Sequence, residues 1–184
     1  MTQQQQPKFQ RTVRLTNSKS PRSAWVVAVD YLSRRALTHY ELKTRLEKKS
    51  FESADIDRVL TKLEELGYLN DQELALMYSK SRLKRYSRRR VLHDLQNRGV
   101  VPQLIEQALE ETYSSDEEFQ QCLSLAKLWW EQEGKRWEQR NTEKTTRSAP
   151  RELWLQQKVA RRLTQRGYPS DMVRSVLYEI RAEL

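Results

Sequence analysis

Apolar residues recur along this chain at the three-to-four-residue spacing of an amphipathic helix, and one helix–turn–helix pattern of them occurs three times. The pattern is clearest in residues 88–109, where an apolar helical face is followed by a turn at Gly99 and by a second helix beginning at Pro102. It returns without gaps 49 residues earlier and 68 residues later. Such repetition predicts an array of one supersecondary unit. The aligned positions are Leu46, Leu95 and Leu163; Ser50, Gly99 and Gly167; Phe51, Val100 and Tyr168; Ser53, Pro102 and Ser170; Ile56, Ile105 and Val173; and Leu60, Leu109 and Leu177.

A further helix precedes each of these helix pairs, so the predicted unit contains three helices. Ala28, Tyr31 and Arg35 have counterparts of the same type 47 residues later, which indicates that the first helix repeats as well. The repeats are expected at residues 21–69, 70–114 and 115–184. The predicted fold is therefore all-α, with three tandem three-helix repeats in an elongated, curved array.

Two segments depart from the apolar pattern. Residues 1–20 are glutamine-rich and basic with little periodicity, which predicts a disordered N-terminal tail. Residues from about 131 to 150 form a polar insertion in the third repeat, which predicts a frayed helix extension followed by a loop.

Local signals predict where several helices begin and end. Thr38 and Glu41 have the spacing of a capping box at the start of a helix. Ser53 is the expected N-cap of the following helix, and Gly67 the expected left-handed residue after it. Asn70 or Asp71 should then cap the first helix of the second repeat.

Composition supports the helical class and excludes others. Four glycines and five prolines are too few for the frequent turns of an all-β fold. The single cysteine, Cys122, excludes an internal disulfide and a thiolate cluster for zinc, and its apolar neighbours predict that it is buried. No apolar run reaches the roughly 18 residues needed to cross a bilayer, and the N-terminus lacks the hydrophobic segment of a secretory signal. We therefore expect a cytoplasmic protein that makes no membrane contact.

Motifs for catalysis are missing from the sequence. His39 and His93 lie on predicted helices without a cluster of possible metal ligands around them. The chain has no glycine-rich phosphate loop and no nucleophile motif. We expect no enzymatic activity, no metal and no cofactor.

The formal net charge is +9, and the basic residues are clustered. Seven of them and no acidic residue lie between Leu74 and His93, interleaved with Tyr78 and Tyr86, whose rings could stack on bases. Smaller basic groups occupy comparable regions of the other two repeats. This distribution predicts a surface for a long, periodic polyanion such as a nucleoprotein filament. The candidate contact residues are Arg34, Arg35, Lys43, Arg45, Lys80, Arg82, Lys84, Arg85, Arg88, Arg89, Arg90, Arg98, Arg161, Arg162 and Arg166.

Several short motifs along the chain form a set. They are Tyr31-Leu32 with Arg35, Glu41-Leu42, Arg45-Leu46, Gly67-Tyr68-Leu69-Asn70-Asp71 with Leu74-Ala75 and Arg82, and Gln165-Arg166-Gly167-Tyr168 with Met172-Val173. Together they resemble the RecX family of regulatory proteins over roughly residues 24–180. The resemblance implies three tandem three-helix units and a non-enzymatic modulator of the recombinase RecA. It also implies binding in the groove of the RecA–DNA filament, bridging of neighbouring RecA subunits, and inhibition of ATP hydrolysis and strand exchange.

The chain departs from the usual RecX pattern in three places. Tyr86 stands where a glycine is common, Leu74 replaces a usual aromatic residue, and the insertion at 131–150 is long and polar. The insertion bears on how the third unit would seat in a groove. With the filament as partner, we expect a monomer whose own contacts with single- and double-stranded DNA are weak and non-specific.

A second hypothesis is a helix-turn-helix DNA-binding protein acting in transcription or nucleoid organisation. The spacing of residues 42–60 fits such a motif. Against it, the pattern is repeated rather than singular, and no dimer element is evident. Duplex DNA titrated at several salt concentrations separates the two hypotheses, because sequence-selective binding survives moderate salt and non-specific binding does not.

Overall fold

The computed structural model describes residues 23–112, 114–141 and 150–182. Within these ranges every regular element is a helix, which confirms the predicted all-α class. The predicted tail at 1–20 and the part of the predicted insertion at 142–149 lie outside the described residues. The helices are α1 (Ala24–Arg34), α2 (His39–Glu47), α3 (Ser53–Glu65), α4 (Asp71–Leu83), α5 (Arg88–Asn97), α6 (Pro102–Thr112), α7 (Ser115–Asn141), α8 (Arg151–Gln165) and α9 (Ser170–Ala182).

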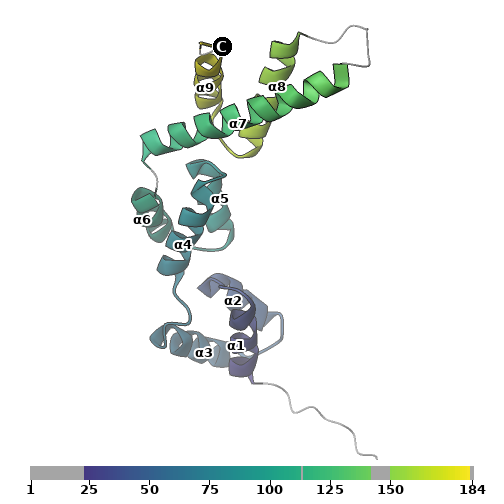
Figure 1. Ribbon diagram of the computed structural model, residues 1–184. Coiled ribbons are helices and arrows are strands. Elements are labelled where there is room, and N and C mark those ends of the chain that lie inside the picture. Colours follow the sequence, from purple (N-terminus) through teal and green to yellow (C-terminus); the bar gives the residue numbers. More distant parts are fainter. Residues whose placement is uncertain (1–22, 113, 142–149, 183–184) are drawn as a thin grey trace, which may run out of the picture.

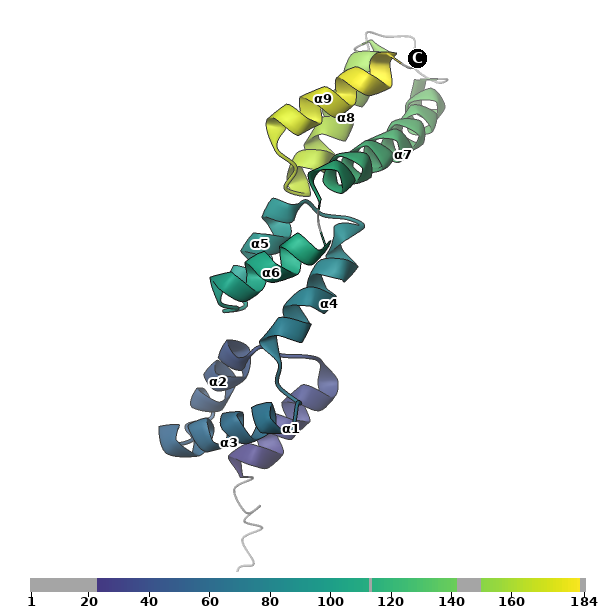
Figure 2. The same ribbon diagram turned by 90° about the vertical axis from the view of Figure 1, so that its left-hand side faces the viewer.

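The helices are grouped in threes, and the groups follow one another along a long axis (Figure 1 and Figure 2). We call α1–α3 unit 1, α4–α6 unit 2 and α7–α9 unit 3. Most contacts between helices fall inside these groups. The two views show the units stacked end to end rather than around a common centre, which confirms the predicted tandem array.

Each unit has its own hydrophobic core. The repeat-equivalent leucines Leu46, Leu95 and Leu163 are fully buried, one in each core. Burial of a leucine side chain contributes about 1.5–3 kcal/mol relative to exposure. The repeated apolar positions therefore build three small cores, as expected of a repeat protein in which a unit contacts only its neighbours.

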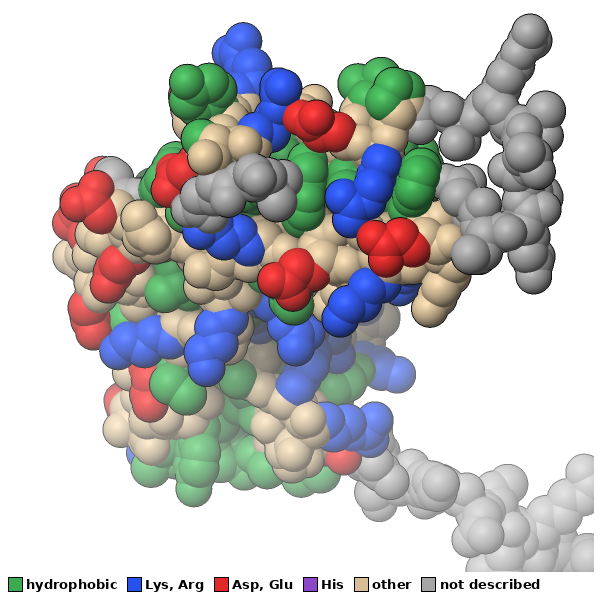
Figure 3. All heavy atoms as spheres, turned by 45° about the horizontal axis from the view of Figure 1, so that its top comes forward, with side chains coloured by type: hydrophobic (Ala, Val, Ile, Leu, Met, Phe, Trp, Pro, Cys, Tyr) green, Lys and Arg blue, Asp and Glu red, His purple; other side chains and the backbone are tan. Residues whose placement is uncertain are grey.

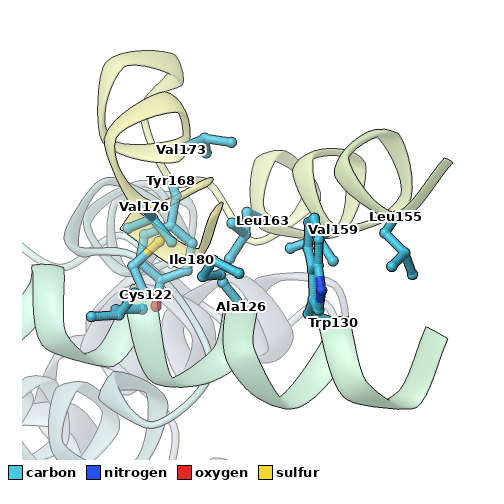
Figure 4. Close-up of a cluster of buried hydrophobic side chains, with 11 residues drawn as sticks. Cys122, Ala126, Trp130, Leu155, Val159, Leu163, Tyr168, Val173, Val176 and Ile180 are labelled. Carbon is cyan, nitrogen blue, oxygen red and sulfur yellow. The ribbon is translucent and has the colours of Figure 1, made fainter. Parts of the chain in front are cut away.

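The core of unit 3 also confirms the prediction for the single cysteine. Cys122 of α7 is fully buried beside Val176 of α9, and Trp130 of the same helix lies against Val159 of α8 (Figure 4). Burial, assisted by the charge of Glu118, raises the pKa of the Cys122 thiol to about 12. The thiol is therefore a packing group, because its reactive thiolate form is scarce at neutral pH.

Most of the predicted helix ends are confirmed, and one is wrong. The Thr38 hydroxyl accepts from the Glu41 N–H, and the Glu41 carboxylate accepts from the Thr38 N–H, both at 3.1 Å, which is the predicted capping box. Asn70 caps α4, and Gly67 has a φ of 72° after α3. Ser53, however, is the first residue of α3 rather than its N-cap, a position held by the preceding residue without a side-chain bond.

The turn after the middle helix of each unit has the same left-handed backbone. Its residue is Ser50 in unit 1, Gly99 in unit 2 and Gly167 in unit 3, with φ values of 60°, 77° and 90°. These are the positions that align in the sequence repeat. The repeat thus extends from the apolar pattern to the backbone conformation.

The polar segment after residue 130 is helical, which confirms the predicted helix extension, but it packs against a neighbouring helix rather than fraying. α7 continues regularly to Asn141, and α8 packs alongside it. Glu133 is 6% exposed and pairs with Arg162 of α8 at 3.1 Å. At the start of α8, Arg151 pairs with Glu138 at 3.1 Å. Ion pairs with α8 therefore accompany the continuation of α7 through the polar segment.

Candidate functional site

Unit 1 and unit 2 meet where the start of α2 lies against the turn after α5, a contact we call joint 1. Thr38, the N-cap of α2, donates its hydroxyl to the backbone carbonyl of Arg98 at 2.6 Å. The Arg98 guanidinium pairs with Glu41 at 2.9 Å, and each of these side chains is 18% exposed. Gly99 passes so close to the base of the Tyr40 side chain that no Cβ fits between them.

Unit 2 and unit 3 meet at the equivalent place one repeat later, joint 2. The backbone N–H of Ser87, the N-cap of α5, donates to the carbonyl of Arg166 at 3.1 Å. A Cβ on Gly167 would lie 2.6 Å from the Ser87 hydroxyl. Both joints therefore place the hydroxyl N-cap of one unit against the arginine C-cap and left-handed turn of the next. The stacking of the units is a repeated feature, as their cores are.

Arginine and aromatic side chains alternate in a row that connects the two joints. At joint 1, Arg98 lies over the ring of Tyr78 with its central carbon 5.4 Å from the ring centroid. Arg82 lies over the same ring at 5.0 Å and over Tyr86 at 5.4 Å. Tyr78 is oriented by a 3.2 Å hydrogen bond that its hydroxyl donates to Asp94. The row in unit 2 is thus fixed by contacts at each step.

The row continues across joint 2 into unit 3. Arg166 lies over Tyr86 at 4.7 Å and over Trp129 at 5.8 Å, so it connects α7 with the segment between α4 and α5. Arg162, one turn earlier on α8, lies over Trp129 at 5.4 Å. We define the arginine–aromatic row as Arg98, Tyr78, Arg82, Tyr86, Arg166, Trp129 and Arg162.

The row has the chemistry of a surface for nucleic acid. Guanidinium groups donate to phosphates in pairs, and aromatic rings stack on bases of any sequence. Each cation–π contact contributes about 0.5–1 kcal/mol at an exposed site and holds a guanidinium plane in place. Figure 3 shows Lys and Arg side chains gathered across the middle of the face, below unit 3. The arrangement can bind a polyanion, whereas nothing in it resembles a catalytic constellation.

The structure places the predicted contact residues in three settings. Arg82, Arg98, Arg162 and Arg166 belong to the arginine–aromatic row, and Arg45 lies over Tyr31 at 5.2 Å. Arg34, Arg35, Lys43, Lys80 and Arg90 pair with carboxylates, and Arg88 donates to the Leu109 carbonyl. Lys84, Arg85, Arg89 and Arg161 are exposed, and their side chains have no partner among the described residues. Exposed ion pairs contribute only about 0–1 kcal/mol, so the paired cations also remain able to exchange partners. Contact of any of these residues with a partner stays a prediction.

Sequence reasoning missed Trp129 and did not foresee that Arg98 and Arg166 hold units together. Trp129 lies just before the polar segment. Its neighbours along the helix do not indicate that it shares an arginine with Tyr86 of another unit. A signal for the two arginines was available. They occupy the same repeat position, directly before Gly99 and Gly167, which is typical of a structural role.

Neither histidine lies in a metal site of the described structure. His39 is 3.6 Å from Glu64, and His93 Nδ1 is 3.0 Å from the amide of Asn97. The described residues contain no group of three or more His, Cys, Asp or Glu side chains placed to hold a metal ion. Among the helices they form, none has the length and apolar character required to span a membrane.

Joint 1 is expected to weaken in acid through Glu41. Partial burial raises the pKa of this carboxyl, but hydrogen bonds from Arg98 and the Thr38 N–H, with the charges of Arg98 and Arg35, outweigh burial and lower the pKa below its ordinary value. A carboxyl whose pKa is lowered on folding stabilises the fold above its unfolded pKa of about 4.3 and loses that contribution as the pH falls through the folded value. In urea unfolding, Glu41→Gln should lower the midpoint at neutral pH, and the difference from wild type should shrink below about pH 4.3.

Glu106→Gln is the control for this experiment, because Glu106 is an exposed residue of α6 outside both joints. It should leave the midpoint close to wild type at each pH. A Glu41→Gln difference that stays constant across the acid range would show that the Glu41 charge does not stabilise joint 1.

The fold and the two joints define a tandem three-helix repeat protein with a basic, aromatic-bearing face. Residues 24–63 match the family model described as RecX, first three-helix domain, and residues 70–109 match RecX, second three-helix domain. The chain belongs to the RecX family of regulatory proteins.

Curated relatives agree with this assignment. Regulatory protein RecX of Listeria innocua serovar 6a is 28% identical over 159 residues, which cover 85% of this chain and 54% of the relative. Regulatory protein RecX of Finegoldia magna is 35% identical over 92 residues, which cover 49% of this chain and 45% of the relative. The chain spans about half the length of the curated relatives it matches.

Solved structures share the fold. The crystal structure of RecX from Lactobacillus salivarius has a TM-score of 0.64 and 19% identity, covering 86% of this chain and 95% of that one. A crystal structure of a regulatory protein RecX has a TM-score of 0.64 and 20% identity, covering 83% and 70%. At these identities the likeness concerns the fold, and it supports the stack of three-helix units.

Proposed function

We propose that this protein binds the filament that RecA forms on DNA and inhibits RecA's ATP hydrolysis and strand exchange. The observation that carries the proposal is the arginine–aromatic row on the side of a RecX family chain, flanked by cations that have no partner among the described residues. A filament repeats along its axis, and a stack of equivalent units offers contacts at successive intervals. The protein acts by occupying a surface, without catalysis or a cofactor.

The proposed mode of action is a bridge between neighbouring RecA subunits in the filament groove. Joints 1 and 2 fix the units to one another through backbone hydrogen bonds, an ion pair and stacked guanidinium groups. A stiff bridge of this kind opposes relative movement of the subunits it contacts. We further propose a cytoplasmic monomer whose contacts with free single- or double-stranded DNA are weak and non-specific.

The charges of α3 disfavour the alternative of a helix-turn-helix DNA reader at residues 42–60. In such proteins the last helix of the motif enters the major groove, which is lined by phosphates. The last helix of this motif is α3, in which the carboxylates outnumber the two cations, and Arg58 and Lys62 each pair with a carboxylate of the same helix. Phosphates would repel this helix, whereas the basic residues lie at the end of α4 and the start of α5.

A titration of RecA's ATPase activity on single-stranded DNA tests the proposal. We expect the rate of ATP hydrolysis to fall at substoichiometric to equimolar amounts of this protein relative to RecA, with a parallel loss of strand exchange. An unrelated protein of similar net charge, at the same concentrations, controls for non-specific coating of DNA. Unchanged ATPase activity, strand exchange and filament length would refute the proposal.

A further inference from the structure

Joint 2 contains an open basic pocket of about 390 Å³. The α5 residues Arg89, Arg90 and His93 form one side, and Thr164 of α8 and Ser170 of α9 form the other, with the turn after α8 between them. None of the described residues that line the pocket is acidic. The Arg89 side chain is exposed and has no partner among those residues, and Arg90 pairs with Asp94 outside the pocket at 3.0 Å.

The same place in joint 1 carries a tyrosine and a glutamate instead of two arginines. Arg89 occupies the repeat position of Tyr40, whose side chain lies directly against Gly99. Arg90 occupies the position of Glu41, which pairs with Arg98 at 2.9 Å. Joint 1 therefore has one ring and one carboxylate at the positions where two arginines line the pocket of joint 2. The carboxylate of joint 1 is thus replaced by an arginine in joint 2, whose pocket lining contains cations and no acidic side chain.

We infer that the joint 2 pocket binds a phosphate group of a nucleic-acid backbone. Two guanidinium groups with adjacent hydroxyls suit the oxygens of phosphate, because arginine donates its N–H groups in pairs at a fixed angle. The inference rests on the proposed function, in which DNA inside the filament is part of the partner.

The surroundings favour a nucleic acid over an acidic protein side chain. Arg166 of the arginine–aromatic row lies at the same joint, so a strand that carries a bound phosphate would meet a further guanidinium group there. Arg161 is one helical turn from Thr164 on the same face of α8 and is also unpaired among the described residues. It is placed to meet a neighbouring phosphate of the same strand.

A variant that gives joint 2 the residues of joint 1 tests the inference. Arg89→Tyr with Arg90→Glu installs a ring for the pocket and a carboxylate for Arg166, as joint 1 has them. We expect unchanged helical content and severalfold weaker binding of fluorescein-labelled oligothymidine measured by anisotropy. The logarithm of the binding constant should also depend less on the logarithm of the salt concentration, by about 0.7 for each phosphate that the variant no longer binds.

The matched control is Arg58→Glu with Lys62→Gln, which changes the net charge equally on the exposed face of α3 in unit 1. It should leave the salt dependence close to wild type. The same slope in both double variants would overturn the inference. If the joint 2 variant folds poorly, Arg89→Gln replaces it, since the exposed Arg89 side chain has no partner among the described residues. A salt dependence of Arg89→Gln equal to that of wild type would also overturn the inference.

Failure of the inference can be separated from failure of the proposed function. If the joint 2 variant binds oligothymidine like wild type but no longer inhibits RecA, the pocket takes a partner protein's carboxylate and the nucleic-acid inference is wrong. If wild type leaves RecA unaffected while oligothymidine binding depends on Arg89, the proposed function fails and the pocket remains.

Discussion

Gly99→Ala is expected to lower the urea midpoint and to broaden the unfolding transition, whereas Gly67→Ala should have a much smaller effect. Both glycines have similar left-handed backbones, with φ of 77° and 72°, so alanine costs about 1–2 kcal/mol of conformational strain at either position. A Cβ on Gly99 would in addition overlap the base of the Tyr40 side chain, which cannot rotate away, whereas a Cβ on Gly67 meets open space. Overpacking adds about 1–3 kcal/mol and separates unit 1 from unit 2.

Urea unfolding followed by circular dichroism at the helix wavelengths measures this difference. A broader transition is expected because the cooperativity of a repeat array depends on contacts between neighbouring units. Equal midpoints and slopes for the two variants would show that joint 1 does not couple the units.

Reversal of three exposed cations should nearly abolish binding to DNA and strongly reduce inhibition of RecA. Lys84, Arg85 and Arg89 are suitable because their side chains have no partner among the described residues, so replacement by glutamate breaks no observed contact. The logarithm of the oligothymidine binding constant falls with the logarithm of the salt concentration by about 0.7 for each phosphate bound. If each of the three cations meets one phosphate, this slope should therefore become shallower by about 2 in the variant. Arg88 is left intact, because it donates to the Leu109 carbonyl at 3.2 Å and its N–H bonds to Glu118.

The control has the same charge change on other surfaces, with glutamate at Arg58, Lys62 and Lys135. It should retain most of the inhibition, measured as the concentration that halves the RecA ATPase rate. Equal losses in both triple variants would show that net charge, and not the surface at the end of α4 and the start of α5, decides binding.

The contacts that organise the candidate site could be read from the sequence only in part. The basic cluster and the interleaved tyrosines were evident, because charge and residue type are properties of the sequence itself. That Arg166 would stack on Tyr86 was not, since the two residues belong to different units and their contact depends on how joint 2 packs. The packing of the polar part of α7 was missed for the same reason: Glu133 pairs with Arg162 of another helix, which a local pattern cannot reveal.

The sequence by itself determined the helices, the three-helix unit and its three copies. Leucines at helical spacing, such as Leu46, Leu95 and Leu163, lie on one face of each helix, so the sequence determines which face is buried. A turn with a left-handed backbone favours glycine wherever it occurs. The tertiary structure alone decided which cations are paired, which are stacked and which have no partner among the described residues. It also decided that Glu41 pairs with Arg98 in joint 1, while a basic pocket lies at joint 2. Those properties depend on distances between side chains of different units, which spacing along one chain does not determine.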